Sequence, residues 1–361
     1  MKIAILGAGN AGCAVAADLS IKGFEVTLIK TSDSMHNENF EYLKENNGKI
    51  MITENGETKQ TNIYKVTKDL KEVENNEVII IYIQTKYHEE LIKKISPYLN
   101  KEQILIINPG YLSTAYVLKH CKEIPIVVEA ESSFIDCRIE KPGSIKVGFR
   151  NVRNPVGVYP NKRTKYVSEK LKNLDYHLEY ITTIEAALHN PNMIVHTVGA
   201  VMSIPRIEKT NGDYCMYHEV FTPSVWNILE KLDQEKMNVI ESLGFDRLSY
   251  VEACKYRNSL NEERDAKEVF FWYASMPTRA KGPTKVDSRY ISEDVPQGLV
   301  MLETLGKELN IKTPICTSLI EIASAALSRD LRKEGRTVEK LGKNNIIKIL
   351  EDSKKKNNRE K

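Results

Sequence analysis

The sequence predicts two domains, an α/β domain followed by a mainly α-helical domain. Two observations lead to this prediction. Apolar strand patterns alternate with helical patterns up to about Thr183, whereas from Ile184 onward apolar residues recur mainly at helical spacing. The chain also has 361 residues, more than one hydrophobic core usually holds. We therefore expect an α/β domain at 1–183, a helical domain at 184–350 and a flexible lysine-rich tail at 351–361.

The chain opens on a strand, a glycine turn, a helix and a second strand. Lys2 to Leu6 is a short apolar run that reads as the first strand. Asn10 to Ile21 then repeats small and apolar residues at helical spacing, and Glu25 to Ile29 is a second apolar strand. This order is the one expected where a strand delivers a glycine turn to the start of a helix.

The turn carries Gly7, Gly9 and Gly12 in G-x-G-x-x-G spacing. Gly7 permits the tight turn, Gly9 lets the backbone approach a pyrophosphate, and Gly12 lets helix and strand pack closely. The glycines could serve only the turn and its packing, but both flanks favour a phosphate site at the helix N-terminus. We therefore predict a Rossmann domain that binds a dinucleotide through Gly7, Gly9, Asn10, Ala11 and Gly12.

The end of the second strand bears on the choice between NAD and NADP. NAD-dependent enzymes commonly place a carboxylate there, and this chain has Lys30 followed by Thr31 and Ser32. A cation followed by hydroxyl groups suits a 2′-phosphate, so the sequence favours NADP, bound by these three residues. In the alternative, Lys30 is merely solvated, Asp33 reaches the ribose hydroxyls and the cofactor is NAD.

Further strands are expected in the first domain. A hairpin around Asn55-Gly56 joins Lys49 to Thr53 with Lys59 to Val66. The almost continuous apolar run from Glu77 to Ile83 is typical of a parallel strand buried on both faces. The other expected elements are strands at Gln103 to Ile107, Ile124 to Glu129, Lys146 to Arg150 and Val156 to Tyr159, and a helix at Arg163 to Leu171.

The second domain shows helical periodicity in several long segments. These are Met193 to Ile204, Val225 to Leu243, Tyr250 to Asn258, Glu263 to Tyr273, Val300 to Leu309 and Ser318 to Leu331. The first of them is apolar nearly all round and should be buried, yet it contains His196, with Asn192 one turn earlier. On its own, such a histidine is more often a core residue than a catalytic one.

A second polar segment, Arg289 to Gly298, places an arginine and two carboxylates before a proline and a glycine. Taken alone, it is also consistent with a capped helix start, in which Glu293 and Asp294 complement the helix dipole.

With these motifs the chain resembles the opine dehydrogenases, the octopine and nopaline dehydrogenase group, over nearly its whole length. The resemblance is carried by the glycine opening, by Asn-x-x-x-His at Asn192 and His196, and by Arg-x-x-x-x-Asp at Arg289 and Asp294. It implies a Rossmann domain followed by a helical domain. It also implies that His196 and Asp294 form a catalytic dyad, that Asn192 supports the histidine, and that Arg289 binds a substrate carboxylate.

The resemblance further implies a reaction. The family joins the amine of an amino acid to an α-keto acid, usually pyruvate, and reduces the imine with NADH or NADPH. The segment Glu129 to Arg138 is similar to the family's region near the keto-acid pocket, so Ser132 and Cys137 are expected to contact substrate. The residue types fit this chemistry, because histidine shuttles protons near neutral pH and an arginine fork pairs with a carboxylate.

Two other functions stay open at this point. One is a different reductase of the same wider group, such as a ketopantoate reductase or a glycerol-3-phosphate dehydrogenase. Those enzymes commonly rely on a lysine where this chain offers a histidine and an aspartate. The other is a protein that senses NADP without turnover, which a complete set of histidine, aspartate and arginine disfavours, because a sensor has no use for a proton shuttle.

Composition narrows the class of protein. A net charge of +3 with lysines spread along the chain gives no support for nucleic-acid binding. The six cysteines form no C-x-x-C pair or zinc-type cluster, so we expect reduced thiols in the cytoplasm and no metal. No signal peptide or membrane span is expected, because a strand begins at residue 2 and no apolar run of about 18 residues occurs. A homodimer is compatible with the helical domain.

Overall fold

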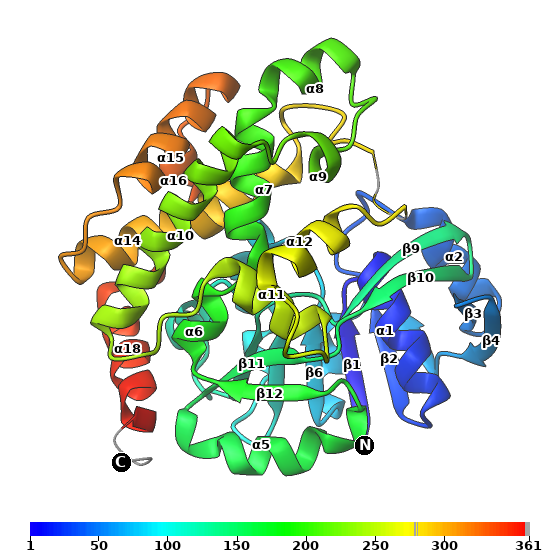
Figure 1. The fold of residues 1–361 in the computed structure, drawn as a ribbon. Coiled ribbons are helices and arrows are strands. Elements are labelled where there is room, and N and C mark those ends of the chain that lie inside the picture. Colours follow the sequence, from blue (N-terminus) through cyan, green and yellow to red (C-terminus); the bar gives the residue numbers. More distant parts are fainter. Residues whose placement is uncertain (278, 280, 358–361) are drawn as a thin grey trace. The chain divides into compact units, whose positions relative to one another are not determined.

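The structure, a computed structural model, describes residues 1–277, 279 and 281–357. The chain divides into two compact units, Met1–Thr183 and Ile184–Lys361 (Figure 1). The first unit is α/β and the second is helical, so the predicted fold class is confirmed.

The first unit is built on an eight-stranded sheet whose strand order is β12-β11-β8-β7-β6-β1-β2-β5. All neighbours in it are parallel except β8 and β11. The central strands are runs of isoleucine, leucine and valine buried on both faces, as expected of parallel strands covered by helices. The strands are β1 (Lys2–Leu6), β2 (Glu25–Ile29), β5 (Lys65–Thr67), β6 (Val78–Ile81), β7 (Ile104–Ile107), β8 (Ile126–Ala130), β11 (Asn154–Tyr159) and β12 (Leu178–Ile181).

A second sheet of four strands has the order β4-β3-β10-β9. Its strands are β3 (Lys49–Glu54), β4 (Glu57–Asn62), β9 (Ile135–Lys141) and β10 (Ser144–Arg150). The predicted hairpin is present between β3 and β4, where Asn55 and Gly56 have φ values of 50° and 85°. Positive φ at both positions is the geometry that an Asn-Gly turn favours.

The single strand expected from Lys59 to Val66 is wrong. The chain leaves the small sheet after Asn62, and Lys65–Thr67 joins the large sheet beside β2. Between them Ile63 is buried in the core, so the chain crosses here from one sheet to the other. Strand β9, which pairs with β10, was not expected from the sequence.

Helix α1 (Asn10–Ile21) contacts strands of both sheets, and Figure 1 shows β9 and β10 beside it. Its side chains from Gly12 to Leu19 are buried, and most of them are small. Small side chains allow strands to approach the helix from more than one side. The Asn10 side chain adds a polar link, because its Oδ1 accepts a hydrogen bond of 2.9 Å from the backbone N–H of Ile139 in β9.

The remaining helices of the first unit cover the large sheet or connect its strands. They are α2 (Asn37–Glu45), α3 (His88–Ile95), α4 (Thr114–His120) and α5 (Thr164–Leu171), with short 3₁₀ turns at Leu70–Asn75, Thr85–Tyr87, Ser96–Tyr98, Asn161–Arg163 and Lys172–Leu174.

The second unit is assembled around helix α7 (Pro191–Met202), which packs against α10, α11, α13 and α15. Its helices are α6 (Thr183–Leu188), α7, α8 (Ile204–Thr210), α9 (Met216–Glu219), α10 (Pro223–Ser242), α11 (Tyr250–Asn258), α12 (Ala266–Ala274), α13 (Arg289–Ser292), α14 (Val300–Glu308), α15 (Pro314–Leu327), α16 (Leu331–Glu334), α17 (Val338–Leu341) and α18 (Lys343–Asn357). A π-helical turn, Val295–Leu299, precedes α14.

The last helix, α18, extends into the segment that the sequence predicted to be a flexible tail. The expected tail at 351–361 is helical over its first residues, because α18 runs to Asn357, and residues 358–361 lie outside the described part of the chain. Among the described residues, no helix is both long enough and apolar enough to span a bilayer.

Candidate active site

The glycine turn of the first unit has the geometry that a dinucleotide needs. Gly7 has a φ of 117°, and a Cβ there would collide with the carbonyl oxygen of Tyr82. A Cβ on Gly12 would collide with the carbonyl oxygen of Gly7. Gly9 precedes α1 and has no side chain to cap it, which leaves the N–H groups at the helix start to a phosphate. The residues present therefore fit a pyrophosphate.

Lys30 follows β2 directly and is buried, with 5% of its surface exposed. Its Nζ donates to the carbonyl oxygen of Met35 at 2.5 Å and lies 5.7 Å from the ring centre of Phe40 in α2. Burial lowers the pKa of this ammonium. The alternative of a merely solvated Lys30 is wrong. Its ammonium is hydrogen-bonded to the backbone of Met35, in the loop that also contains Thr31 and Ser32.

Asp33, the alternative ribose-binding residue, is exposed on the same loop. Its Oδ1 accepts from Lys68 Nζ at 2.8 Å, and this bond lowers the pKa of the carboxyl. Lys68 therefore adds a second cation near Lys30, because its Nζ lies 5.5 Å from the centre of the same Phe40 ring. Lys68 could not be singled out from the sequence, because its approach to Asp33 depends on the pairing of strand β5 with β2.

His36, which was not singled out from the sequence, lies beside the glycine turn. Its ring Cδ2 is 3.7 Å from the point that a Cβ on Gly9 would occupy. Its backbone has a φ of 56°, an uncommon conformation for a residue with a side chain. The side chain thus faces the part of the turn nearest to the predicted phosphates.

In the second unit, His196 and Asp294 are hydrogen-bonded. His196 Nδ1 lies 2.8 Å from Asp294 Oδ2, although the residues are 98 positions apart in sequence. Both side chains are nearly fully buried. The carboxylate holds the proton on Nδ1, so the unprotonated position of the neutral ring is Nε2, on the side away from Asp294.

Opposing effects act on the protonation of His196. Burial disfavours the imidazolium and lowers the pKa of the ring, whereas the hydrogen bond and charge of Asp294 raise it. The positive charges of Arg289 and Arg279 lower it further, and the net direction is downward. A buried histidine whose pKa is lowered by burial and raised by a carboxylate partner is typical of a proton-transfer site.

Aromatic rings fix the plane of the imidazole. The Tyr290 ring stacks on His196 with centroids 3.9 Å apart and an interplanar angle of 19°. Tyr217 meets the imidazole edge-on at 6.4 Å. Neither tyrosine was identified from the sequence. The only local signal was that Tyr290 lies next to Arg289 in the polar segment.

The local sequence explains how both members of the pair are positioned. Asn190 caps α7, accepting from the backbone N–H of Asn192 at 3.0 Å, and Pro191 stands at its first position. Asp294 precedes the π-helical turn, a feature that is frequent at functional sites. Arg289 is exposed at the start of α13. No hydrogen bond joins the side chains of Asn192 and His196, both of which the structure describes.

The two residues expected near a keto-acid pocket lie in the first unit. Ser132 is half-buried and accepts a long hydrogen bond of 3.4 Å from the Asn151 side chain. Cys137 lies in β9 within the hydrophobic core, where burial raises the pKa of its thiol to about 12. A substrate contact from Ser132 stays a prediction, whereas the geometry of Cys137 favours a structural role over its predicted substrate contact.

A buried ionic cluster lies beside the start of α7. Lys236 Nζ is 2.7 Å from Asp233 Oδ1, 3.0 Å from the carbonyl oxygen of Leu248 and 3.5 Å from His189 Nδ1. The other oxygen of Asp233 accepts from the N–H of Tyr250 at 2.7 Å. Since His189 immediately precedes the capping residue of α7, the cluster fixes the point at which this helix begins.

We expect Asp233→Ala to destabilise the protein by about 3 to 5 kcal/mol, because it leaves the Lys236 ammonium buried without its carboxylate. Urea unfolding followed by circular dichroism measures this change. Asp213→Ala is the control, since Asp213 pairs with Lys281 on the surface and its loss should leave the midpoint unchanged. Equal stability of Asp233→Ala and the wild type would contradict the structural role of the cluster.

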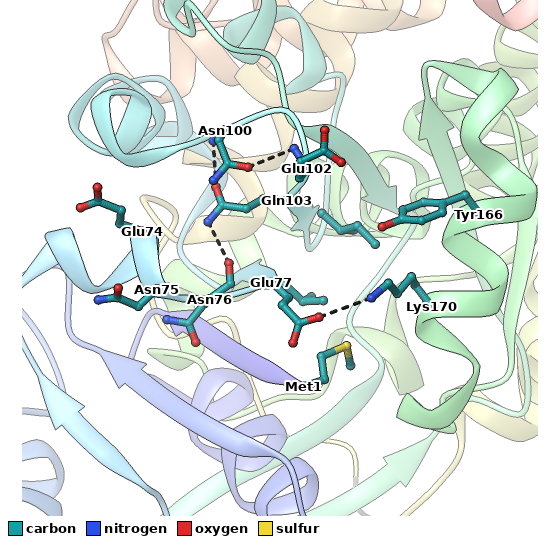
Figure 2. A pocket seen from close by; sticks show the side chains of 12 residues that line it. Met1, Glu74, Asn75, Asn76, Glu77, Asn100, Glu102, Gln103, Tyr166 and Lys170 are labelled. Carbon is teal, nitrogen blue, oxygen red and sulfur yellow. Dashed lines mark hydrogen bonds and ion pairs between the residues drawn. The ribbon is translucent and has the colours of Figure 1, made fainter.

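A hollow of about 350 Å³ in the first unit lies at the amino ends of β6 and β7 (Figure 2). Gln103 donates to the carbonyl oxygen of Asn76 at 2.8 Å, and Lys170 pairs with Glu77 at 3.4 Å. The glycine turn follows the carboxyl end of the parallel strand β1, at the opposite edge of the sheet. Since open α/β sheets bind ligands at carboxyl ends, this hollow is not the nucleotide site.

Together, a dinucleotide turn and a buried His–Asp pair define an NAD(P)-dependent oxidoreductase. Residues 180–327 match the family described as NAD/NADP octopine/nopaline dehydrogenase, alpha-helical domain, and residues 3–153 match the ketopantoate reductase PanE/ApbA family. The opine dehydrogenase of Arthrobacter sp. strain 1C is 28% identical over 348 residues, which cover 94% of each chain.

Solved structures show the same fold. Octopine dehydrogenase with NADH and L-arginine matches with a TM-score of 0.75 and 14% identity over 95% of this chain and 96% of that one. Yersinopine dehydrogenase with NADP⁺ matches with a TM-score of 0.69 and 14% identity over 98% and 99%. These matches confirm the resemblance to the opine dehydrogenases that the sequence motifs predicted.

Proposed function

We propose that this protein is an NAD(P)H-dependent opine dehydrogenase, which condenses an amino acid with an α-keto acid such as pyruvate and reduces the imine. The observation that carries the proposal is the buried hydrogen bond of 2.8 Å between His196 and Asp294. The match of residues 180–327 to the octopine/nopaline dehydrogenase family supports it, because that segment contains His196 and Asp294. The ketopantoate reductase family matches residues 3–153, and a ketopantoate reductase structure shares the fold over 92% of this chain with a TM-score of 0.63, so that alternative is supported as a wider group.

The reaction places defined demands on the chain. The amine nitrogen attacks the keto carbon, the former carbonyl oxygen leaves as water, and the resulting C=N bond is reduced to a secondary amine. The nicotinamide nucleotide supplies the hydride. A proton must reach the departing oxygen, and the imidazolium of His196 can donate it from Nε2. Asp294 stabilises that imidazolium, and Arg289 binds a substrate carboxylate through its planar fork.

A single assay separates this function from its alternatives. NADPH oxidation is measured with keto acid alone, amino acid alone and both together. We expect oxidation only when both are present, with a secondary amine as the product. Oxidation with keto acid alone would instead indicate a hydroxy-acid-forming reductase. Nucleotide binding without oxidation under any condition would favour the sensing protein.

The cofactor is proposed to be NADP in preference to NAD. Lys30 and Lys68 place positive charge at the loop after β2, and His36 faces the glycine turn. Positive charge there complements a 2′-phosphate, which NADP carries and NAD lacks. Lys30 can act either directly or by holding the loop through Met35.

We expect Lys30→Met to weaken NADPH binding roughly tenfold or more while changing NADH affinity little, because a charge-assisted contact is lost and the aliphatic stem is kept. Isothermal titration with both nucleotides measures the effect, and exposed Lys146→Met serves as the control. If both nucleotides weaken equally, Lys30 acts through the loop and not on the 2′-phosphate.

We further propose that the protein acts in the cytoplasm and forms a homodimer. All six cysteines are buried and free of disulfides, as suits a reducing compartment. Cell fractionation and analytical ultracentrifugation test these two points.

A further inference from the structure

Arg279 lies between α12 and α13 and is held against two tyrosines. Its guanidinium carbon is 3.6 Å from the ring centre of Tyr273 and 5.1 Å from that of Tyr217. Its Nε also donates to the carbonyl oxygen of Tyr273 at 3.2 Å. A guanidinium that is stacked and hydrogen-bonded in this way has a fixed plane, which favours bidentate recognition of a carboxylate.

This arginine lies close to the His–Asp pair. The guanidinium of Arg279 lies over the ring of Tyr217, and the same ring meets the imidazole of His196 edge-on, with ring centroids 6.4 Å apart. One aromatic ring therefore contacts both side chains. The electrostatic effect of Arg279 on His196 agrees with this proximity, because its charge lowers the pKa of the ring.

A second arginine belongs to another segment that contacts His196. Arg289 is the neighbour in sequence of Tyr290, whose ring stacks on the imidazole at 3.9 Å. His196 is thus contacted by two tyrosines, and each tyrosine is associated with a different arginine. The positive charges of both arginines lower the pKa of the imidazole, which agrees with a position of both near His196.

The chemistry of the proposed reaction calls for two cations. An amino acid and an α-keto acid each bring one carboxylate, and neither carboxylate is consumed when the C–N bond forms. The secondary amine that results carries two carboxylates, one on each side of the nitrogen. A site that orients both reactants around one proton donor is therefore served best by two separate anion-binding groups.

We infer that Arg279 binds the second substrate carboxylate, so that Arg279 and Arg289 hold the two reactants separately around His196. This inference rests on the proposed function and adds a substrate-binding residue to it. It also specifies that the amine donor must carry a carboxylate for full affinity. A decarboxylated amine would leave one of the two guanidinium groups without its anion.

The test compares Arg279→Met, Arg279→Lys and Arg289→Met with the wild type in steady-state kinetics. Arg279→Met should raise the KM of one reactant roughly tenfold or more, and Arg289→Met should raise the KM of the other. Arg279→Lys keeps the charge and loses the fork, so it should lie between them. NADPH affinity should stay unchanged in all three.

Arg264→Met is the matched control, because Arg264 also stacks on an aromatic ring, 5.3 Å from the centre of Trp272. It should change neither KM. The inference is overturned if Arg279→Met leaves both KM values unchanged, or if it raises the same KM as Arg289→Met. A variant that merely unfolds is recognised by its melting temperature, and Arg279→Lys then decides.

A binding measurement separates this inference from the function itself. In the presence of NADP⁺, iminodiacetate, a secondary amine with two carboxylates, should raise the melting temperature of the wild type. N-methylglycine, with one carboxylate, should raise it less. Arg279→Met should remove the difference between the two compounds, and its persistence would refute the role of Arg279. Absence of opine turnover in the wild type would refute the proposed function independently of this result.

Discussion

His196→Ala is expected to lower turnover by about 10⁴-fold in both directions while NADPH still binds. The substitution removes the group proposed to pass a proton to and from the substrate oxygen. It does not alter the glycine turn of the first unit, where the nucleotide is expected to bind. Stopped-flow measurement of NADPH oxidation, together with titration of NADPH, determines both quantities.

The control for this substitution is His218→Ala, which removes an exposed histidine from α9 in the same unit. It should have the activity of the wild type. A folded His196→Ala protein that binds nucleotide and keeps its turnover would show that His196 is a core residue. Circular dichroism establishes that the variant is folded, since removal of a buried ring leaves a cavity.

Asp294→Asn is expected to lower kcat by about 10³-fold with the fold intact, because the histidine loses the anion that orients it and stabilises its charged form. The direction of the pH effect follows from the structure. Asp294 raises the pKa of His196 against the lowering effect of burial. Removing the carboxylate therefore lowers that pKa further. If imidazolium drives the condensation, activity in that direction is lost as pH rises, and the loss moves to lower pH in the variant.

Rate profiles from about pH 5 to pH 9 for the wild type and Asp294→Asn test this shift. Asp213→Asn, at an exposed ion pair, is the control and should reproduce the wild-type profile. An unchanged alkaline limb in Asp294→Asn would mean that His196 does not carry the proton that limits the reaction.

The elements near the glycine turn could be predicted closely from the sequence. The predicted bounds of β1, α1 and β2 agree with the structure because their signals are local: strand runs, glycine spacing and small side chains at helical period. The strand expected at Lys59 to Val66 failed for a non-local reason. Its first part pairs with β3 in the small sheet, and its last part pairs with β2 in the large sheet. The periodicity of the sequence does not show that the chain passes from one sheet to the other between them.

The site was predictable in part for the same reason. The short motifs identified His196 and Asp294, but only the fold shows that these two residues, 98 positions apart in the sequence, are hydrogen-bonded to each other. The stacking of Tyr290 and the placement of Arg279 arise from tertiary packing and leave no periodic signal. Lys30 was identified, yet its position 5.7 Å from the ring centre of Phe40 depends on the tertiary placement of α2, which contacts β5.

Both members of the His–Asp pair belong to the second unit, whereas the glycine turn belongs to the first. Residues of the first unit match the ketopantoate reductase family, and residues of the second match the helical domain of the octopine/nopaline dehydrogenases. A chain divided in this way can change the side chains around His196 through substitutions in the second unit alone, while the glycine turn of the first unit stays as it is.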